Sequence, residues 1–291
     1  MELSVDQSLC VPCDECLLEC PSGAVWRDER DGRYHIDHNS CIRCSHCAAV
    51  CPPGAVRSDA GSFPGWRDPH LDSALVRDFL CGKRSVRRYR PEPIPRTVLD
   101  DIIQVGSLTA TASNAQDWQA VVVTGQAVRE VAAELFAFYL PLVRLASHPL
   151  VKPFLRFTDL RGYAKRKGMF ERYEQRLLEF EKGDDPFLFH ASAVVILTFP
   201  RRNRRYGRVN CVLAGQAMMY YAQALGIGSC MIGFMETALN LRGKLRRKVG
   251  LPRSRKPGLV FTLGVSDVAY RRLPLRGPLP VSYLDSVSSR D

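Results

Sequence analysis

The residues best suited to chemistry in this 291-residue chain are eight cysteines near its N-terminus. They form two runs of the same spacing, C-x2-C-x2-C-x3-C-P, displaced by 31 residues. In runs of this kind three thiolates surround one iron–sulfur cluster, and the fourth ligates the other cluster. The spacing therefore predicts two [4Fe–4S] clusters, the first held by Cys10, Cys13, Cys16 and Cys51 and the second by Cys41, Cys44, Cys47 and Cys20.

Disulfide bonds and zinc are the other uses of closely spaced cysteines. Disulfides are typical of small secreted chains, and the N-terminus lacks the basic and apolar segments of a signal peptide. Zinc usually takes two CxxC pairs, fewer thiols than these runs offer. Pro21 and Pro52, which follow the last cysteine of each run, end each helical turn. This stretch resembles a bacterial two-cluster [4Fe–4S] ferredoxin domain over about the first 60 residues.

The composition is that of an ordinary globular protein, with 46% hydrophobic and 24% charged residues. No apolar run approaches the roughly 20 residues that a membrane span needs. Eight cysteines committed to clusters imply a reducing compartment. We therefore expect a cytoplasmic protein that does not bind membranes.

The net charge of +11 is unevenly distributed. Residues 1–66 contain five arginines, no lysine and ten acidic residues, a net −5, whereas the remainder carries +16. An acidic N-terminal part and a basic body should attract each other. The basic runs at 201–208 and 242–256 come without a nucleic-acid-binding motif, so we expect solvated faces or an anionic-cofactor site and no nucleic-acid partner.

A basic loop follows the N-terminal part and contains Lys83, Arg84, Ser85 and Arg87. Such a loop can hold a phosphate, because arginine offers a planar fork of donors and serine a further one. Pro95 then begins an amphipathic helix. The helix leads into the polar sequence Thr-Ala-Ser-Asn-Ala-Gln-Asp-Trp at 111–118, and a valine-rich strand follows at 121–124.

In this order, these features resemble the FMN-dependent nitroreductase superfamily over about residues 71–280. The resemblance implies that Arg84, Ser85 and Arg87, with Lys83 nearby, hold the FMN phosphate. It implies that Asn114 reaches the isoalloxazine ring and that Gln116 lines the same loop. The sequence departs from the family pattern in two places: Asp117 stands where the family usually has proline, and Thr111 where serine is common.

The second half of the chain continues the resemblance. A helix is expected over 126–140, a lid that covers the flavin over about 141–185, and a buried strand over 192–199. Residues 209–225 are apolar almost all round, which suits a helix buried in a dimer. The Gly-rich segment at 226–234 implies a backbone that passes close to flavin N5 at Met231, Ile232 and Gly233. Arg271 and Arg272 occupy the place of a second phosphate contact.

The expected fold class is α+β, a small ferredoxin-like two-cluster domain followed by an FMN-dependent nitroreductase-like α/β sandwich. The expected boundaries are 1–60 for the two-cluster domain, 61–70 for a linker and 71–291 for the FMN domain. A C-terminal tail from about residue 266 should embrace a second subunit. The isolated Cys81 is expected to be a small core residue.

These expectations define an FMN-dependent oxidoreductase. An external low-potential donor such as ferredoxin would supply single electrons through the clusters, and FMN would pass hydride to an electrophilic organic acceptor such as a nitroaromatic, a quinone or an activated alkene. No residue is assigned as the proton donor. Three alternatives stay open: a reductive dehalogenase that uses Tyr163, Lys165, Glu171 and Tyr173 of the lid, a flavin-fragmenting enzyme, and a non-enzymatic electron carrier or redox sensor.

Overall fold

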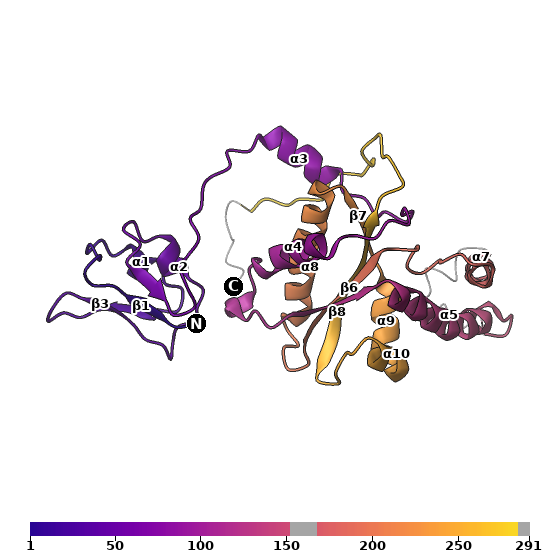
Figure 1. The fold of residues 1–291 in the computed structure, drawn as a ribbon, viewed down its shortest axis with the longest axis horizontal. Coiled ribbons are helices and arrows are strands. Elements are labelled where there is room, and N and C mark those ends of the chain that lie inside the picture. The colour runs from indigo at the N-terminus through magenta and orange to yellow at the C-terminus, as the bar shows by residue number, and fades with distance from the viewer. Residues whose placement is uncertain (152–167, 285–291) are drawn as a thin grey trace, which may run out of the picture.

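The computed structural model describes residues 1–151 and 168–284 (Figure 1). The N-terminal part contains two short helices and four short strands. In chain order these are β1 (Leu3–Val5), α1 (Glu15–Leu18), β2 (Val25–Arg27), β3 (Tyr34–Ile36), α2 (His46–Ala49) and β4 (Val56–Ser58). Strand β1 pairs antiparallel with β4, and β2 pairs antiparallel with β3. A small core of its own, which includes Leu3, Val25, Tyr34 and Val56, holds this part together.

The 31-residue repeat of the sequence is also a repeat of conformation. Asp14 and Ser45 cap α1 and α2 in the same left-handed conformation, with φ of 61° and 65°. Gly23 and Gly54, also 31 residues apart, have φ of 63° and 65°, a region that glycine adopts without steric cost. Each half therefore repeats one loop, one helical turn and one glycine corner around its cysteines.

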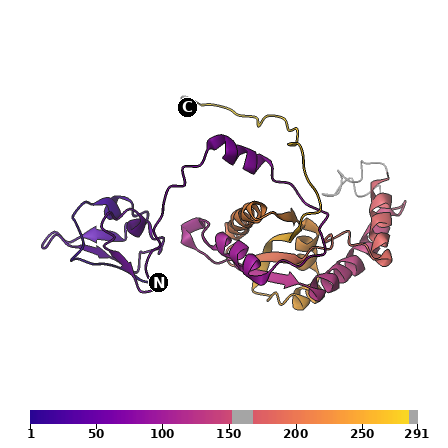
Figure 2. The same cartoon turned by 45° about the horizontal axis from the view of Figure 1, so that its top comes forward.

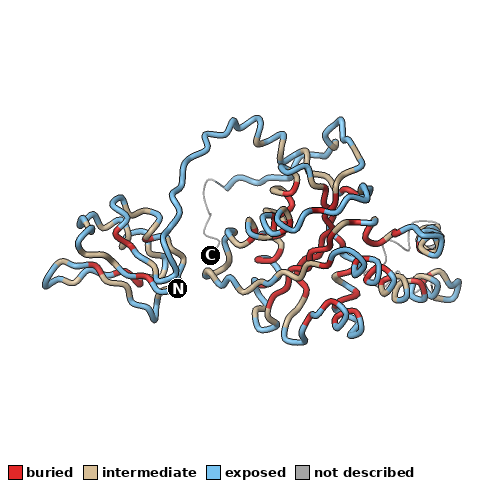
Figure 3. The backbone as a smooth tube through the Cα atoms, viewed as in Figure 1, coloured by how far each residue is buried: buried red, intermediate tan, exposed pale blue. Residues whose placement is uncertain are grey.

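An exposed segment joins this N-terminal part to the rest of the chain. Residues 59–75 are all exposed, and α3 (Ser73–Cys81) begins within them, capped by the carboxylate of Asp72. Figure 3 shows the segment as a continuous exposed arc. No residue of α3 is buried, so the prediction that Cys81 lies in the core is wrong. The apolar face of this short helix is only partly covered by its own chain: Phe79 lies against Tyr220 with ring centroids 5.9 Å apart, whereas Leu75 is 66% exposed.

A four-stranded antiparallel sheet forms the centre of the larger part. Its strand order is β5 (Gln119–Thr124), β6 (Ala193–Pro200), β8 (Arg255–Val265) and β7 (Ile227–Met231). Strand β6 is buried on both faces from Ala193 to Phe199, as its apolar sequence, interrupted only by Thr198, predicts. Its side chains alternate, so that Val195 and Leu197 pack on one side of the sheet and Val194 and Ile196 on the other.

Helices cover both faces of this sheet (Figure 1). One face packs against α4 (Arg96–Ser107) and α8 (Gly207–Ala224). The other packs against α5 (Gln126–Ser147), α9 (Gly233–Leu241) and α10 (Gly243–Lys248). The helix α7 (Met169–Leu178) lies against α5 and continues into a 3-10 turn at Glu179–Lys182. This arrangement is the expected α/β sandwich, and none of the described helices is long and apolar enough to cross a membrane.

The predicted end of the helix at residue 140 is wrong. Helix α5 continues through Pro141 as far as Ser147. A proline removes one backbone hydrogen bond from a helix, but Leu140 and Ala146 are buried on either side of it and α7 packs along the same helix. Packing therefore offsets the local cost. Of the lid residues named from the sequence, Tyr163 and Lys165 lie outside the described residues.

Candidate functional site

The eight cysteines of the two runs line two separate small cavities. One is lined by Cys10, Cys13, Cys16 and Cys51, together with the ring of Tyr34. The other is lined by Cys20, Cys41, Cys44 and Cys47, together with Leu3. The last cysteine of each run thus lies with the first three cysteines of the other run, in the interleaved sets that the spacing predicts.

Backbone N–H groups donate to the sulfur atoms of Cys20 and Cys51, the last cysteine of each run. The N–H of Ala24 donates to Cys20 Sγ at 3.2 Å, and the N–H of Ala55 donates to Cys51 Sγ at 3.1 Å. Burial opposes ionisation of Cys20, yet backbone donors at Val25, Ser22 and Ala24 hold its pKa below the usual value. Hydrogen bonds to sulfur are among the features that tune iron–sulfur clusters.

Three of the other thiols, those of Cys10, Cys16 and Cys47, have pKa values raised above the usual value. Burial raises the pKa of Cys47 to about 11, and burial with neighbouring cysteines raises the pKa values of Cys10 and Cys16. Clustered thiols of this kind favour a cation that stabilises the thiolates. The four-thiol lining of each cavity therefore fits an iron–sulfur cluster.

The distances between the cysteine sulfur atoms can be compared with those that a bound zinc ion requires. A tetrahedral zinc ion with Zn–S bonds of about 2.3 Å brings its sulfur ligands to about 3.8 Å from one another. Among the described residues, the ligand atoms grouped within 4.8 Å of one another are those of Asp28, Asp31 and His35 and not three cysteine sulfurs. The cysteine sets are thus more widely spread than a single zinc ion requires.

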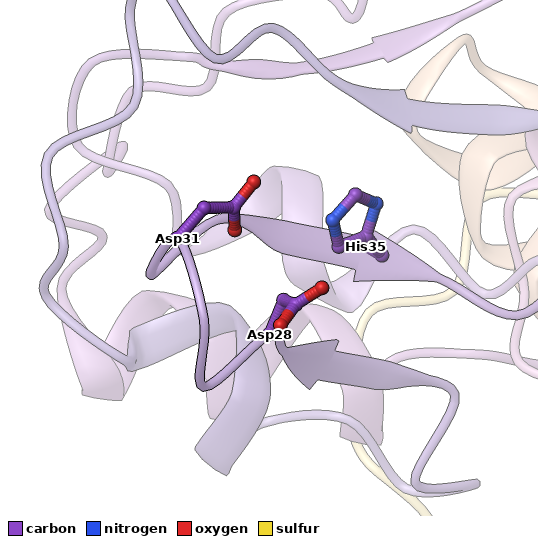
Figure 4. Close-up of side chains that lie close together, drawn as sticks. All are labelled: Asp28, Asp31 and His35. Atoms are coloured by element: carbon purple, nitrogen blue, oxygen red, sulfur yellow. The ribbon is translucent and has the colours of Figure 1, made fainter.

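The group of Asp28, Asp31 and His35 lies on the hairpin between β2 and β3 (Figure 4). Asp28 and Asp31 accept hydrogen bonds from the backbone N–H groups of Arg30 and Arg33, and His35 stacks on Trp26 with ring centroids 4.7 Å apart. These contacts account for the hairpin, and we assign no ion to it.

The basic loop predicted to hold a phosphate lies beside the edge strand β7. The N–H of Val86 donates to the carbonyl of Ser229 at 3.0 Å. The ammonium of Lys83 donates to the carbonyl of Arg84 at 2.9 Å, and burial lowers the pKa of Lys83. Lys83 thus ties the loop to its own backbone, while Arg84 and Arg87 carry the remaining charge.

The segment after β8 reaches the same loop. The hydroxyl of Tyr270 donates to the carbonyl of Ser85 at 3.3 Å, and the guanidinium of Arg84 lies 5.6 Å from the centroid of the Tyr270 ring. Arg271 and Arg272 follow directly and are exposed. The structure therefore brings both predicted phosphate contacts to one end of the molecule.

A pocket of about 310 Å³ extends from this loop towards the lid. Arg87 lies at its wall, and Phe234, which follows the predicted flavin contacts Met231, Ile232 and Gly233, lies at another. Ile232 is buried and Met231 is 45% exposed. The rest of the lining is mostly aromatic and apolar, with one further arginine from α7: Tyr139, Val143, Tyr173, Arg176, Leu177, Pro186, Phe187 and Phe189.

A larger cavity, of about 650 Å³, lies elsewhere, between the step at Pro91 and Pro93, α5 and the loop at 183–192. None of the predicted flavin residues lines it. Its carboxylates are already engaged, because Asp185 accepts from the N–H groups of Phe187 and Leu188 and Asp184 lies 3.3 Å from His190. We therefore do not assign it to the flavin.

Asn114 and Gln116 do not lie with the basic loop in a single chain. They follow the 3-10 turn η1 (Ala112–Asn114), whose Ala112 N–H donates to Asn210 at the start of α8. The basic loop begins at the other end of α8, where Gln223 donates to Phe79. The thirteen residues between Asn210 and Gln223 correspond to about 20 Å of helix. The two predicted halves of the flavin site therefore lie at opposite ends of α8.

The side-chain amide of Asn114 contacts the second cysteine run instead. It donates to the carbonyls of Ile42 at 3.0 Å and Arg43 at 2.9 Å. The amide of Gln116 donates to Asn114 Oδ1 at 2.9 Å and so orients the side chain. Sequence reasoning missed this contact, because nothing in a motif indicates which distant backbone an asparagine will reach.

Asp117, where the family pattern has proline, is held by polar contacts. Its carboxylate accepts from the amide of Asn203 at 2.9 Å, and its carbonyl accepts from Arg255 at 2.6 Å. Arg255 also donates to the side chain and the carbonyl of Thr198. This network fixes the loop by hydrogen bonds where a proline would fix it by its ring.

Both parts of the chain match known protein families. Residues 80–265 match the family model of the nitroreductase family, and residues 2–52 match that of the 4Fe-4S dicluster domain. The chain belongs to the nitroreductase family.

The relatives that the chain resembles act on nitroaromatic compounds. It is 25% identical over 171 residues to a 4-nitrobenzoate reductase of Pseudomonas putida, which covers 54% of this chain and 72% of the relative. It is also 25% identical over 213 residues to a chloronitrobenzene nitroreductase of Comamonas testosteroni, which covers 67% of this chain and 88% of the relative.

Solved structures share the fold. A nitroreductase with bound FMN from Desulfitobacterium hafniense aligns with a TM-score of 0.53 and 18% identity, over 74% of this chain and all of the other. A nitroreductase with bound FMN from Bacteroides fragilis aligns with a TM-score of 0.52 and 18% identity, over 73% of this chain and all of the other.

Proposed function

We propose that this chain is an FMN-dependent oxidoreductase that receives single electrons through two [4Fe–4S] clusters and delivers hydride to a nitroaromatic acceptor. FMN, when bound, can take up electrons singly and release a pair as hydride. The observation that carries the proposal is the presence in one chain of two four-cysteine cavities and of a basic loop beside the glycine-rich strand β7. The reducing chemistry of the clusters further favours a cytoplasmic location.

Residues of this chain would hold each group. The two interleaved cysteine sets would ligate the clusters. Arg84, Ser85 and Arg87, with Arg271 and Arg272 close by, would bind the FMN phosphate, because a cluster of forked donors suits that group. The backbone at Met231–Gly233 and the side chains of Asn114 and Gln116 would contact the ring system.

The flavin site requires two copies of the chain. Arg84–Arg87 and Asn114 lie at opposite ends of α8, so a single flavin cannot reach both within one chain. If two copies pack along α8 about a two-fold axis, the two helices run antiparallel, and the Arg84–Arg87 end of one copy lies next to the Asn114 end of the other. This face of α8 carries exposed apolar side chains, among them Val209 at 51% and Leu213 at 50%. We therefore propose a homodimer.

The C-terminal tail supports the same assembly. Beyond β8 it leaves the sheet as an extended segment, drawn in yellow in Figure 2. Its apolar side chains are exposed, with Leu275 fully so and Leu279 83% exposed. Apolar side chains in this number, together with those of α3, are suited to burial against a second copy.

The acceptor pocket favours a flat aromatic molecule with an anionic substituent. Its walls offer aromatic rings from Tyr139, Phe187 and Phe234, and the guanidinium of Arg176. Rings can stack on an aromatic substrate, and a guanidinium can pair with a carboxylate or nitro group. The relatives that reduce nitrobenzoate and chloronitrobenzene support this class of acceptor.

The decisive experiment compares electron donors. Full-length protein and a truncation that starts at Pro69 are mixed anaerobically with reduced ferredoxin or with NADPH, and the flavin absorbance is followed by stopped flow. We expect ferredoxin to bleach the flavin of the full-length protein only, with 4-nitrobenzoate restoring the oxidised band. Equal bleaching of both forms by NADPH, with none by ferredoxin, would contradict the proposed electron route.

A further inference from the structure

The contact between Asn114 and the second cysteine run decides which end of the N-terminal part faces the flavin body. The amide of Asn114 donates to two successive carbonyls, those of Ile42 and Arg43, between Cys41 and Cys44. The loop that presents this amide is strongly constrained, because Ser113, Asn114 and Gln116 all have positive φ, between 42° and 52°. Such backbone persists only where surrounding contacts determine it.

The internal repeat supplies a comparison within the same chain. The positions equivalent to Ile42 and Cys44 in the first run are Val11 and Cys13. Both residues of the first run are exposed, whereas both of the second run are half-buried. The second cysteine set therefore faces the body, and the first remains open towards solvent, where an external electron donor can reach it.

Charge supports the same orientation. The N-terminal part carries a net −5 over residues 1–66 before any cluster is added. The loop that contains Asn114 leads to Asp117, which is held by Asn203 within the arginine-rich run at 201–208. An acidic domain seated next to this run is favoured by long-range attraction.

We propose that each iron–sulfur part serves the flavin whose phosphate is held by the other subunit. This inference rests on the proposed function. Asn114 seats the Cys41–Cys44 loop of its own chain at one end of α8, whereas the phosphate loop of that chain lies at the other end, about 20 Å along the helix. The phosphate loop next to the seated cysteine set is therefore that of the partner copy. For each flavin reduced, two molecules of a one-electron donor are oxidised and one proton is taken from water.

Mixed dimers test this crossed route. Two differently tagged chains are co-expressed so that mixed dimers can be purified. The flavin lesion is Arg84→Ala with Arg87→Ala, and the cluster lesion is Cys41→Ser with Cys44→Ser. Each mixed dimer carries one flavin lesion and therefore retains one flavin. With the two lesions on separate chains, we expect reduced ferredoxin to bleach that flavin. With both lesions on the same chain opposite a wild-type chain, we expect the bleaching to be lost.

The alternatives give different results. Bleaching only when both lesions share a chain would show that each cysteine set serves the flavin of its own chain, and equal bleaching in both arrangements would show that the route is not crossed. Both results would overturn the inference. Wild-type dimers that ferredoxin does not bleach at all would overturn the proposed function first, and the crossed route with it.

A second measurement does not depend on electron transfer or on cysteine replacement. Asn114→Asp keeps the shape of the side chain but removes both N–H donors. In hydrogen–deuterium exchange we expect faster exchange around residues 41–44 and unchanged exchange around the equivalent residues 10–13. Unchanged exchange in both loops would overturn the seating by Asn114.

Discussion

Gly228 on β7 packs directly against Val86 of the basic loop: a Cβ built on the glycine would lie 2.9 Å from the Cβ and from both methyl carbons of the valine. Because one of these atoms is the Cβ of Val86, the clash cannot be relieved by rotating the valine side chain, so the loop itself would have to move. The packing of Val86 therefore requires glycine at position 228, and this glycine allows the loop that carries Arg84 and Arg87 to lie against the sheet edge.

Gly228→Ala should displace the basic loop. Forcing a methyl group into a packed site typically costs about 1–3 kcal/mol, and here the displaced segment is the proposed phosphate site. We expect a lower thermal midpoint and loss of FMN on gel filtration. Gly243→Ala is the matched control, because the added Cβ would meet only the flexible end of Arg247 at 3.5 Å. A Gly228→Ala protein that retains full flavin would contradict this assignment.

Gly233→Ala should have a different effect. No heavy atom lies within 4 Å of a Cβ built there, and its φ is not in the left-handed region. The apoprotein should therefore keep its thermal midpoint. If the flavin ring lies against this backbone, FMN affinity should nevertheless fall, measured by fluorescence quenching on titration of the apoprotein. Unchanged FMN affinity would place the ring elsewhere.

Arg84→Ala and Arg87→Ala should each weaken FMN binding. A hydrogen bond to a charged group contributes about 1.5–3 kcal/mol, which corresponds to roughly a tenfold to hundredfold increase in Kd. Arg88→Ala is the control, because its guanidinium is 3.2 Å from the carboxylate of Asp267 on the surface. Equal flavin retention in all three variants would remove the phosphate assignment.

Cys20→Ser should disturb the second cluster although Cys20 belongs to the first run. Its thiol shares a cavity with Cys41, Cys44 and Cys47. We expect iron content to fall from about eight to about four atoms per chain, with the spectrum of the other cluster retained. Cys51→Ser should give the complementary loss. Mössbauer spectra would contradict interleaved ligation if both variants lost the signal of the same cluster.

Lys83 should make stability depend on pH in a defined direction. Burial holds its pKa in the folded chain below the ordinary value of 10.5. The unfolded chain binds this proton more tightly, so the site contributes more stability as pH rises from the lowered pKa towards 10.5. The stability difference between wild type and Lys83→Met should increase between about pH 8 and pH 10. Thermal midpoints measure it, with the exposed Lys182→Met as control, and a difference that decreases with pH would refute the assignment.

Features that depend on the types and spacing of nearby residues could be predicted from the sequence. The two cysteine runs predicted the sets that line the two cavities, because the ligands of each cluster are fixed by a few residues of spacing. The apolar sequence at 193–199, interrupted only by Thr198, predicted a buried strand. The order of basic loop, helix and valine strand predicted the sandwich.

Features that depend on long-range packing could not be read in this way. The motif suggested that Asn114 and Arg84 share one site, whereas the length of α8 separates them within a chain. Pro141 suggested the end of a helix, but contacts with α7 carry α5 through it. Cys81 was expected in a core because small apolar residues are usually buried, whereas α3 is covered by its own chain only at Val76 and Phe79 and leaves Cys81 exposed.

The exposed segment at 59–75 joins two parts of the chain that recombination could exchange independently. The small core around Leu3 and Tyr34 shares no residue with the two cores that flank the large sheet. Recombination within this segment would exchange one electron-supplying part for another without altering either core. Only the few residues that meet Asn114 would have to adapt, so a change of electron donor is open to this architecture through substitutions at one small interface.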